Sequence, residues 1–146
     1  MTGEDRAVWS SVGFNQRVDN LMQYGPTAHV GVAAVPYSSG SAIAALAQFD
    51  TGAAGTGISP RLVERLGLKP IGLGVIQEAG REALTASFFA LRLWLPGIDR
   101  WIDLDVAGLP SLADPHDVLI GRDVMSSFKL VVDFTSGATQ LHFKVK

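Results

Sequence analysis

The sequence predicts a mainly β, barrel-like domain with one or two short helices. Short apolar segments rich in β-branched residues recur along the chain, and clusters of glycine, proline and serine separate them. This pattern is typical of an all-β domain with many turns, and only two segments favour a helix. The 146 residues, 47% hydrophobic and 18% charged, suit one globular domain rather than a disordered chain.

The composition excludes several classes of protein. The net charge is −2 with no long run of either sign, so the chain lacks the basic stripe that attracts nucleic acid or an anionic membrane. The absence of cysteine excludes disulfides, thiolate metal sites and a cysteine nucleophile. No signal peptide and no membrane span of roughly 18 apolar residues is present. We expect a cytoplasmic protein without a nucleic-acid or membrane partner, although a fragment of a membrane-anchored parent would look the same.

The first half of the chain is predicted to form an arm and a hairpin. Residues 1–27 are expected to be an N-terminal arm, either loose or a short helix, with Trp9 and Phe14 as anchors. Residues 29–49 favour a hairpin, because β-branched residues alternate over its first part and an apolar run makes its second part. The apolar run ends at Asp50, so the hairpin delivers a carboxylate to the tip of a buried strand.

The elements after Asp50 follow from capping and turn signals. Ser59 suits the N-cap and Pro60 the first position of a helix of about two turns, and Gly67 suits its C-cap. A glycine-bearing hairpin begins at Ile71 and turns at 78–81. The remaining predicted elements are a turn at 96–99, a loop at 107–117, a short helix at 122–128, and strands at 101–106, 118–120, 130–132 and 141–143.

Two short motifs carry the chemistry that the sequence indicates. Asp50-Thr51-Gly52 combines a carboxylate with a glycine whose missing Cβ permits a sharp turn. Further along, an apolar triplet precedes Gly121, Arg122 and Asp123. Hydrolysis by water needs a base and an acid. Two carboxylates that share one proton supply both, because like charges a few ångströms apart cannot both ionise.

In this order, the two motifs resemble those of the retropepsins, the retroviral type of aspartic protease, in their bacterial and cellular branch. The resemblance covers nearly the whole chain after the arm, so we expect the protease domain to span residues 28–146. It implies a closed acid-protease barrel with a flap hairpin, and an aspartic endopeptidase that acts on a peptide or protein substrate. It implies no cofactor and no metal.

The resemblance also implies which residues form the site. Asp50 would be the catalytic residue, and Thr51, Gly52, Gly121 and Arg122 would support it. The residues that bind the substrate would be Gly52, Ala53, Ala54 and Leu119 in the groove, and Gln77, Glu78, Ala79 and Gly80 in the flap.

The number of motifs predicts the assembly. The chain has a single Asp-Thr/Ser-Gly motif, and Asp133, which also follows an apolar strand, lacks the glycine turn. One aspartate cannot form a carboxylate pair, so the sequence predicts a two-fold homodimer in which each chain contributes Asp50. The resemblance implies that the chain ends interleave in the interface, and residues 141–145 are the candidate strand.

Two departures from the viral members leave an alternative function open. Ala54 and Gly55 stand where viral retropepsins have acidic residues that bind substrate and pair with the arginine of the second motif. Arg122 therefore needs another partner, either a carbonyl or a nearby acid. The flap turn at 78–81 is also more charged and less glycine-rich. The alternative is a dimeric peptide-binding module, catalytically weak or inactive, on the same fold.

Other patterns in the sequence point less clearly to a site. The stretch Gly52–Gly57 is rich in glycine, but no Gly-Lys-Ser/Thr closes it as a phosphate loop requires. Residues 114–117 include metal-ligand types. We interpret them as a solvated, proline-kinked loop, with a place beside the substrate groove as the alternative. Trp94 and Trp101 flank a turn, which favours packing of a hairpin over a ligand platform.

Overall fold

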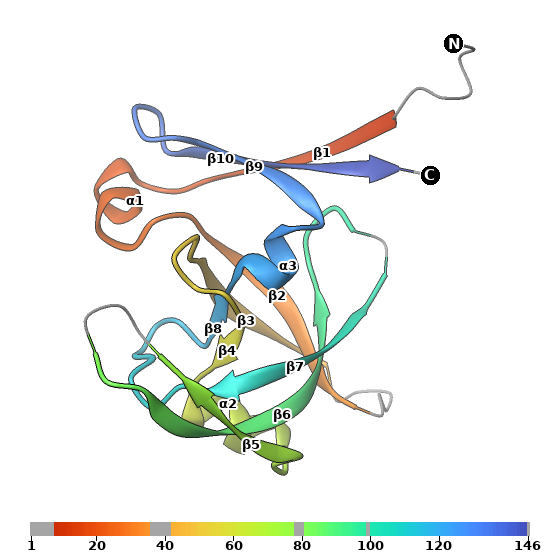
Figure 1. Cartoon of the computed structure of the whole chain (residues 1–146). Coiled ribbons are helices and arrows are strands. Elements are labelled where there is room, and N and C mark those ends of the chain that lie inside the picture. Colours follow the sequence, from red (N-terminus) through yellow and green to blue (C-terminus); the bar gives the residue numbers. More distant parts are fainter. Residues whose placement is uncertain (1–7, 36–41, 78–80, 99, 146) are drawn as a thin grey trace.

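The computed structural model describes residues 8–35, 42–77, 81–98 and 100–145, and it contains a closed β-barrel with a smaller sheet beside it (Figure 1). Six strands pair in the order β2, β3, β8, β4, β7 and β6, and pairing of β6 with β2 closes the barrel. A further strand, β5, pairs with the outer edge of β6. The strands are β2 (Thr27–Ala34), β3 (Ile43–Phe49), β4 (Gly57–Ile58), β5 (Gly72–Ile76), β6 (Leu84–Trp94), β7 (Ile102–Gly108) and β8 (Val118–Ile120). The predicted mainly β barrel is confirmed.

Two local predictions around the first motif are also confirmed. Strands β2 and β3 form the expected antiparallel hairpin, and β3 ends at the residue before Asp50. Helix α2 (Pro60–Leu66) begins after Ser59, whose hydroxyl accepts a hydrogen bond from the third helical amide. It ends at Gly67, whose φ of 62° lies in the left-handed region that favours glycine.

The second predicted helix is shorter than expected. Helix α3 (Arg122–Met125) covers four residues, whereas the sequence predicted a helix over 122–128. Strand β9 (Phe128–Asp133) starts at the end of that range because Phe128 pairs with Phe143 of the last strand. Pairing with the next strand of the chain therefore decides the conformation of residues that have a fair local preference for helix.

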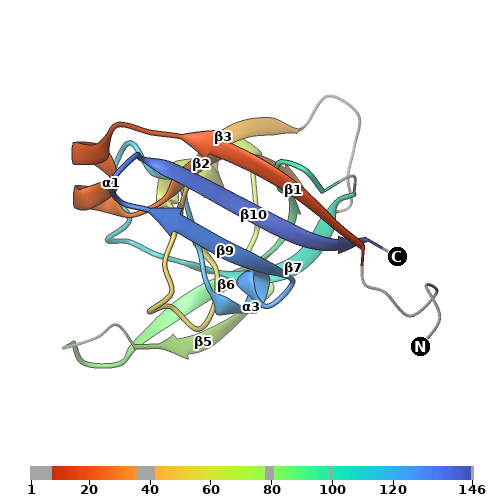
Figure 2. The same ribbon diagram turned by 90° about the horizontal axis from the view of Figure 1, so that it is seen from above.

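The smaller sheet has three strands in the order β1, β10 and β9. Figure 2 shows β10 (Ala138–Val145) lying between β1 (Val8–Asn15) and β9. The sequence predicted a loose arm or a short helix for the first residues. The structure has a strand there, followed by the short helix α1 (Val18–Tyr24). Strand β1 was missed because its pairing partner is β10, at the other end of the chain. The boundary expected at residues 27 and 28 stays a prediction.

A row of aromatic rings joins the smaller sheet to the barrel. Phe14 of β1 stacks on Phe49 of β3 with ring centroids 6.1 Å apart, which confirms Phe14 as an anchor. Phe128 of β9 meets Phe49 edge-on at 6.2 Å and Phe143 of β10 at 5.5 Å. Phe49 is only 3% exposed and belongs to the main hydrophobic core. Phe49, the residue before Asp50, therefore packs β3 of the barrel against the smaller sheet.

The glycine-bearing hairpin forms from β5 and β6, and its tip at residues 78–80 lies outside the described residues. Gly74 of β5 lies under the ring of Phe88 of β6, so a Cβ at this position would collide with that ring. A Cβ at Gly72 would meet nothing within 4 Å. Close packing across the hairpin thus requires glycine at one of these two positions.

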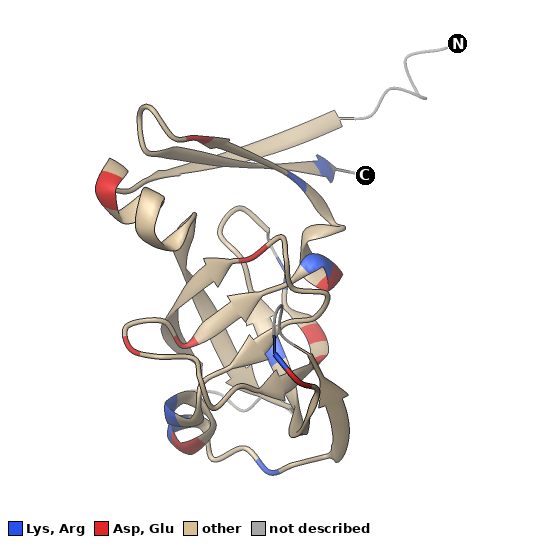
Figure 3. Ribbon diagram, turned by 60° about the vertical axis from the view of Figure 1, so that its left-hand side comes forward, with Lys and Arg blue, Asp and Glu red and all other residues tan. Residues whose placement is uncertain are grey.

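Charged side chains are spread over the fold. Figure 3 shows acidic and basic residues interspersed along the described ribbon. Within the described ranges, no helix has the length and apolar character needed to cross a membrane.

We expect Phe49→Ala to lower the free energy of unfolding by about 3–5 kcal/mol, because it removes a large buried ring and leaves a cavity between the two sheets. Urea unfolding followed by tryptophan fluorescence measures the effect. The control is Leu73→Ala, because Leu73 is 75% exposed and its truncation should change stability by about 0.5 kcal/mol or less. Similar losses for both variants would contradict a core centred on Phe49.

Candidate active site

Asp50 is held at the tip of β3 by its own backbone. Its amide donates to the carbonyl of Ile120 at 2.9 Å, which continues the parallel pairing of β3 with β8. Its carbonyl accepts from Ala53 at 3.1 Å, and its carboxylate oxygen Oδ1 accepts from the Gly52 amide at 2.8 Å. The side chain is partly exposed. The predicted turn at Gly52 is thus present and presents a carboxylate to solvent on a rigid strand.

The second motif supports the loop that follows Asp50. A Cβ on Gly121 would collide with the carbonyl oxygen of Gly55 and lie 3.0 Å from that of Ala53. The amide of Arg122 donates to the Ala53 carbonyl at 2.8 Å, and the amide of Asp123 donates to the next carbonyl at 3.1 Å. The loop therefore rests on the start of α3, and the close approach that the sequence predicted for Gly121 is observed.

Arg122 finds a carbonyl as its partner. Its Nη1 donates to the Thr51 carbonyl at 2.8 Å. The sequence had left open a carbonyl or a nearby acid, since Ala54 and Gly55 replace the expected acids. The guanidinium thus holds the backbone of the Asp50 turn.

The sequence missed a pair of side chains that hold the same loop from inside. The hydroxyl of Thr56 donates to Asp123 Oδ1 at 2.8 Å and accepts from the Gly121 amide at 3.2 Å. The Thr56 amide donates to the other oxygen of Asp123 at 3.2 Å. Thr56 is 3% exposed. The sequence offered one signal for this pair: Thr56 carries a hydroxyl between two glycines, and the acid Asp123 directly follows Arg122.

The remaining expected site residues are only partly described. Ala54 and Gln77 are exposed, and Ala53 is half-buried in the turn. Leu119 is half-buried in β8, between β3 and β4. Glu78, Ala79 and Gly80 lie outside the described residues. The structure brings the Asp50 turn together with Gly121 and Arg122, whereas the substrate-binding residues stay a prediction.

An apolar pocket of about 420 Å³ opens beside Asp50 and Thr51. Its walls come from the end of α1, the start of β2 and one face of β9, and they include Tyr24, Pro26, Phe49, Leu130, Val132 and Phe134. Asp50 is the one carboxylate among the lining residues. Within the described part of the chain, the Thr51 hydroxyl has no hydrogen-bond partner. The candidate site thus has one carboxylate, one free hydroxyl and an apolar wall.

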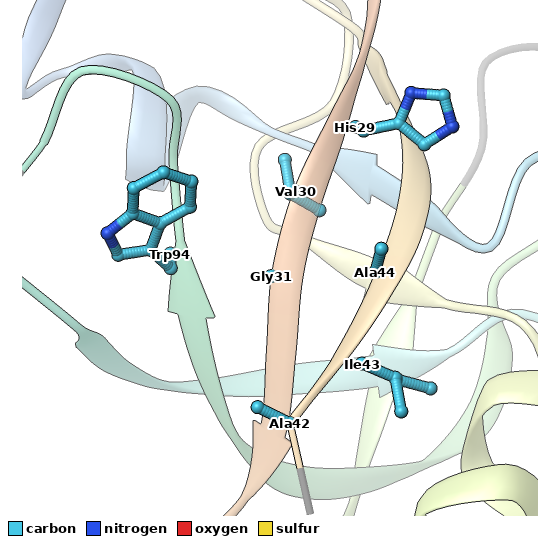
Figure 4. Close-up of a pocket in the computed structure, with 7 residues that line it drawn as sticks. All are labelled: His29, Val30, Gly31, Ala42, Ile43, Ala44 and Trp94. Atoms are coloured by element: carbon cyan, nitrogen blue, oxygen red, sulfur yellow. The ribbon is translucent and has the colours of Figure 1, made fainter.

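A second hollow, of about 280 Å³, lies on the outside of the barrel (Figure 4). Figure 4 shows Trp94 on one side of Gly31, and His29 on the other side together with Ala44 and Ile43 of β3. Trp94 and Trp101 both approach Gly31, which fits the predicted packing role of the tryptophans. Among the described residues that line it, His29 is the one ionisable group, so these residues do not supply the pair of acid and base groups that hydrolysis needs.

The loop at 114–117 is less solvated than the sequence indicated. His116 is 5% exposed and packs on the ring of Tyr24, with ring centroids 4.9 Å apart. Burial lowers the pKa of His116 from its ordinary 6.5, and the charges of Asp117 and Asp114 oppose this shift. Asp117 accepts from Ser59 at 2.6 Å and pairs with Arg61 at 3.0 Å. These contacts pack the loop against α1 and the start of α2. The described residues include no metal-binding cluster of His, Cys, Asp and Glu.

Comparison with known proteins places this geometry in a family. The model of a family described as aspartyl protease matches residues 36–124, which is more than half of the chain and includes both motifs. The chain belongs to the aspartyl protease family. No curated protein matches the chain.

Solved structures show the type of fold. The chain is similar to a retropepsin-like aspartic protease from Rickettsia conorii, with 16% identity over 94% of each chain and a TM-score of 0.54. It is also similar to the retroviral protease-like domain of Ddi1 from Leishmania major, with 19% identity over 73% of this chain and 81% of that chain and a TM-score of 0.44. The first likeness confirms the retropepsin-like barrel expected from the motifs.

We expect Gly121→Ala to lower the free energy of unfolding by about 1–3 kcal/mol, because the new methyl group forces the backbone of residues 53–55 away from α3. The matched control is Gly55→Ala, since a Cβ at Gly55 meets nothing within 4 Å and should change stability by about 1 kcal/mol or less. Denaturant unfolding measures both. Equal effects would show that the loop does not need this close approach.

We expect His116 to make the protein less stable in mild acid. The unfolded chain takes up a proton at His116 near pH 6.5, whereas the folded chain does so only at lower pH. The stabilising contribution of the neutral ring is therefore complete above about pH 6.5 and is lost as the pH falls toward the folded pKa. Urea unfolding at about pH 7.5 and about pH 5.5 should show a smaller loss for His116→Gln than for the wild type. His29→Gln, at an exposed position, should behave like the wild type, and equal losses in all three proteins would contradict the assignment.

Proposed function

We propose that this chain is an aspartic endopeptidase that acts as a homodimer, with one Asp50 from each copy in the active site. The observation that carries the proposal is the presentation of Asp50. A family aspartate stands on the tip of a buried strand, fixed by Ile120 and Gly52 and open to solvent. The carboxylate needs a second one, and the chain offers no second motif of this kind.

In the proposed dimer, a water molecule lies between the two Asp50 carboxylates, which share one proton. The ionised carboxylate takes a proton from the water as the water oxygen bonds to the peptide carbonyl carbon. The protonated carboxyl gives its proton to the carbonyl oxygen. When the carbon–nitrogen bond of the resulting diol breaks, the carboxyl that took the water proton gives it to the departing nitrogen, and a diol hydroxyl returns its proton to the other carboxylate as the carbonyl forms again. No bond to the enzyme forms at any step.

The β5–β6 hairpin supports the proposed binding of an extended peptide. Leu73 and Val75 are 75% and 72% exposed and lie opposite Ser87 and Thr85. Because side chains alternate between the two faces of a strand, Thr85, Ser87 and Phe89 lie on the same face of β6. Leu73 and Val75 therefore share the face of Phe89, whose side chain is buried in the barrel core. The hairpin thus extends an apolar inner face, and its outer strand has a free edge. A substrate strand can add there while the hairpin closes as a flap.

Asp50→Asn should abolish proteolysis while the fold and the dimer persist, because the amide can neither share the proton nor accept one from water. Cleavage of a mixed peptide library, followed by mass spectrometry, measures activity, and sedimentation measures assembly. Treatment of the wild type with a chelator should leave its activity unchanged.

An Asp50→Asn variant that cleaves peptides as fast as the wild type would show that Asp50 is not catalytic. The alternative function has a different signature. If neither protein cleaves but both bind the same peptides as dimers, the chain is a peptide-binding module on the retropepsin-like fold.

A further inference from the structure

We infer that two copies of the chain meet along the free edge of β9, in an antiparallel pair centred on Val131, and not through the terminal strand. This inference rests on the proposed function, because the site with one Asp50 is incomplete without a second copy. The partner is a second copy of this chain, and it contributes the second carboxylate.

The terminal strand is not available for a partner. Strand β10, which includes the residues 141–145 expected in the interface, pairs with β1 from Val8 opposite Val145 to Asn15 opposite Ala138. Its other edge pairs with β9, from Asp133 to Phe128. Over residues 138–143, both hydrogen-bonding edges of β10 are therefore occupied within one chain, which speaks against interleaving through this strand. A partner strand can join this sheet only at β1 or at β9.

The position of the active site favours β9 over β1. Leu130 and Val132 of β9 line the pocket that also contains Asp50 and Thr51, and no residue of β1 lines it. Strand β1 lies two strands away across β10, about 10 Å further at the usual spacing between strands. A second copy on the β9 edge thus arrives next to the carboxylate and the free hydroxyl of Thr51.

Among the described residues, no strand pairs with the outer edge of β9, and exposed apolar side chains lie beside this edge. Val131 and Phe134 are each 47% exposed, and Phe134 lines the pocket beside Asp50. Helix α1 adds Val18, 41% exposed, whose side chain lies near Gly137 in the turn between β9 and β10. An uncovered edge with exposed apolar side chains is a template for another strand. Across a two-fold axis, the unpaired backbone N–H and C=O groups of two such edges can form hydrogen bonds with each other.

The charges on β9 match such a pairing. Lys129, Val131 and Asp133 alternate with the pocket-lining residues, so they share the outer face of the strand. In an antiparallel pair centred on Val131, Lys129 lies opposite the second copy's Asp133 on both sides of the axis. Opposite charges in such cross-strand pairs are favourable, and like charges are destabilising.

The single chain holds the two charged groups in different ways. Asp133 accepts from the amide and hydroxyl of Thr135 at 2.9 and 2.6 Å, and these bonds lower the pKa of its carboxyl. Asp133 therefore stays ionised in mild acid. The Lys129 ammonium lies 4.1 Å from the ring centroid of Trp9, so it changes rotamer to reach the second copy.

The test uses charge reversal and mixing. Lys129→Glu alone, or Asp133→Lys alone, places like charges opposite each other twice, and each should weaken dimerisation about tenfold in sedimentation. A mixture of the two variants again places an acidic side chain opposite a basic one on both sides of the axis, so it should form a heterodimer as tight as the wild-type dimer. Rescue on mixing cannot come from variants that have merely lost their fold.

A single cysteine gives an independent measurement, because the chain has none. Val131→Cys should form a disulfide-linked dimer on oxidation, since residues on the axis bring their Cα atoms within the reach of a disulfide. Ser11→Cys, exposed on β1, is the matched control and should stay unlinked.

Each outcome separates this inference from the proposed function. Linkage through Ser11 but not Val131, no rescue on mixing, or a wild type that stays monomeric would overturn the β9 interface. Proteolysis that depends on Asp50 would still support the protease in the first two cases. A dimer through β9 without proteolysis would support the interface and contradict the proposed function.

Discussion

The contact between Gly121 and the carbonyls of the loop after Asp50 is the constraint on which the candidate site depends. Only a residue without a Cβ lets β8 and α3 come this close to residues 53–55. Because the two segments touch, the amides at the start of α3 reach the loop carbonyls, and Arg122 reaches the Thr51 carbonyl. Behind them, the buried Thr56 donates from its amide and its hydroxyl to the Asp123 carboxylate. The turn that presents Asp50 is thus held by several bonds at once, which suits a group that must keep its position during a reaction.

The fold places this rigid turn at the junction of two sheets. Phe49 packs against Phe14 and Phe128, so the smaller sheet is tied to the strand that carries Asp50. The pocket beside Asp50 has one wall from the barrel strand β3 and another from β9. A partner that binds the smaller sheet therefore acts on the site through packed side chains rather than through a flexible linker.

The sequence predicted the features that depend on local chemistry. The β2–β3 hairpin, the caps at Ser59 and Gly67, and the close approach of Gly121 follow from residue types at fixed spacing. It did not predict features that depend on distant partners. Strand β1 forms because β10 lies beside it, and His116 is buried because Tyr24 of α1 covers its ring. Thr56 was overlooked because its role becomes visible only when Asp123 is near. The flap tip at 78–80 lies outside the described residues.

The pairing of β1 with β10 has a consequence for how the chain folds. This contact joins the two ends of the sequence, so it closes a loop that contains the whole barrel. The chain loses conformational entropy when this loop closes, and it does so before any hydrogen bond between β1 and β10 forms. Most barrel pairings join strands that are closer in sequence. We expect the barrel to collapse first and the terminal sheet to zip up last. During that interval β9 and β10 each have a bare edge, and a nascent chain at high concentration is then exposed to strand exchange with a neighbouring molecule.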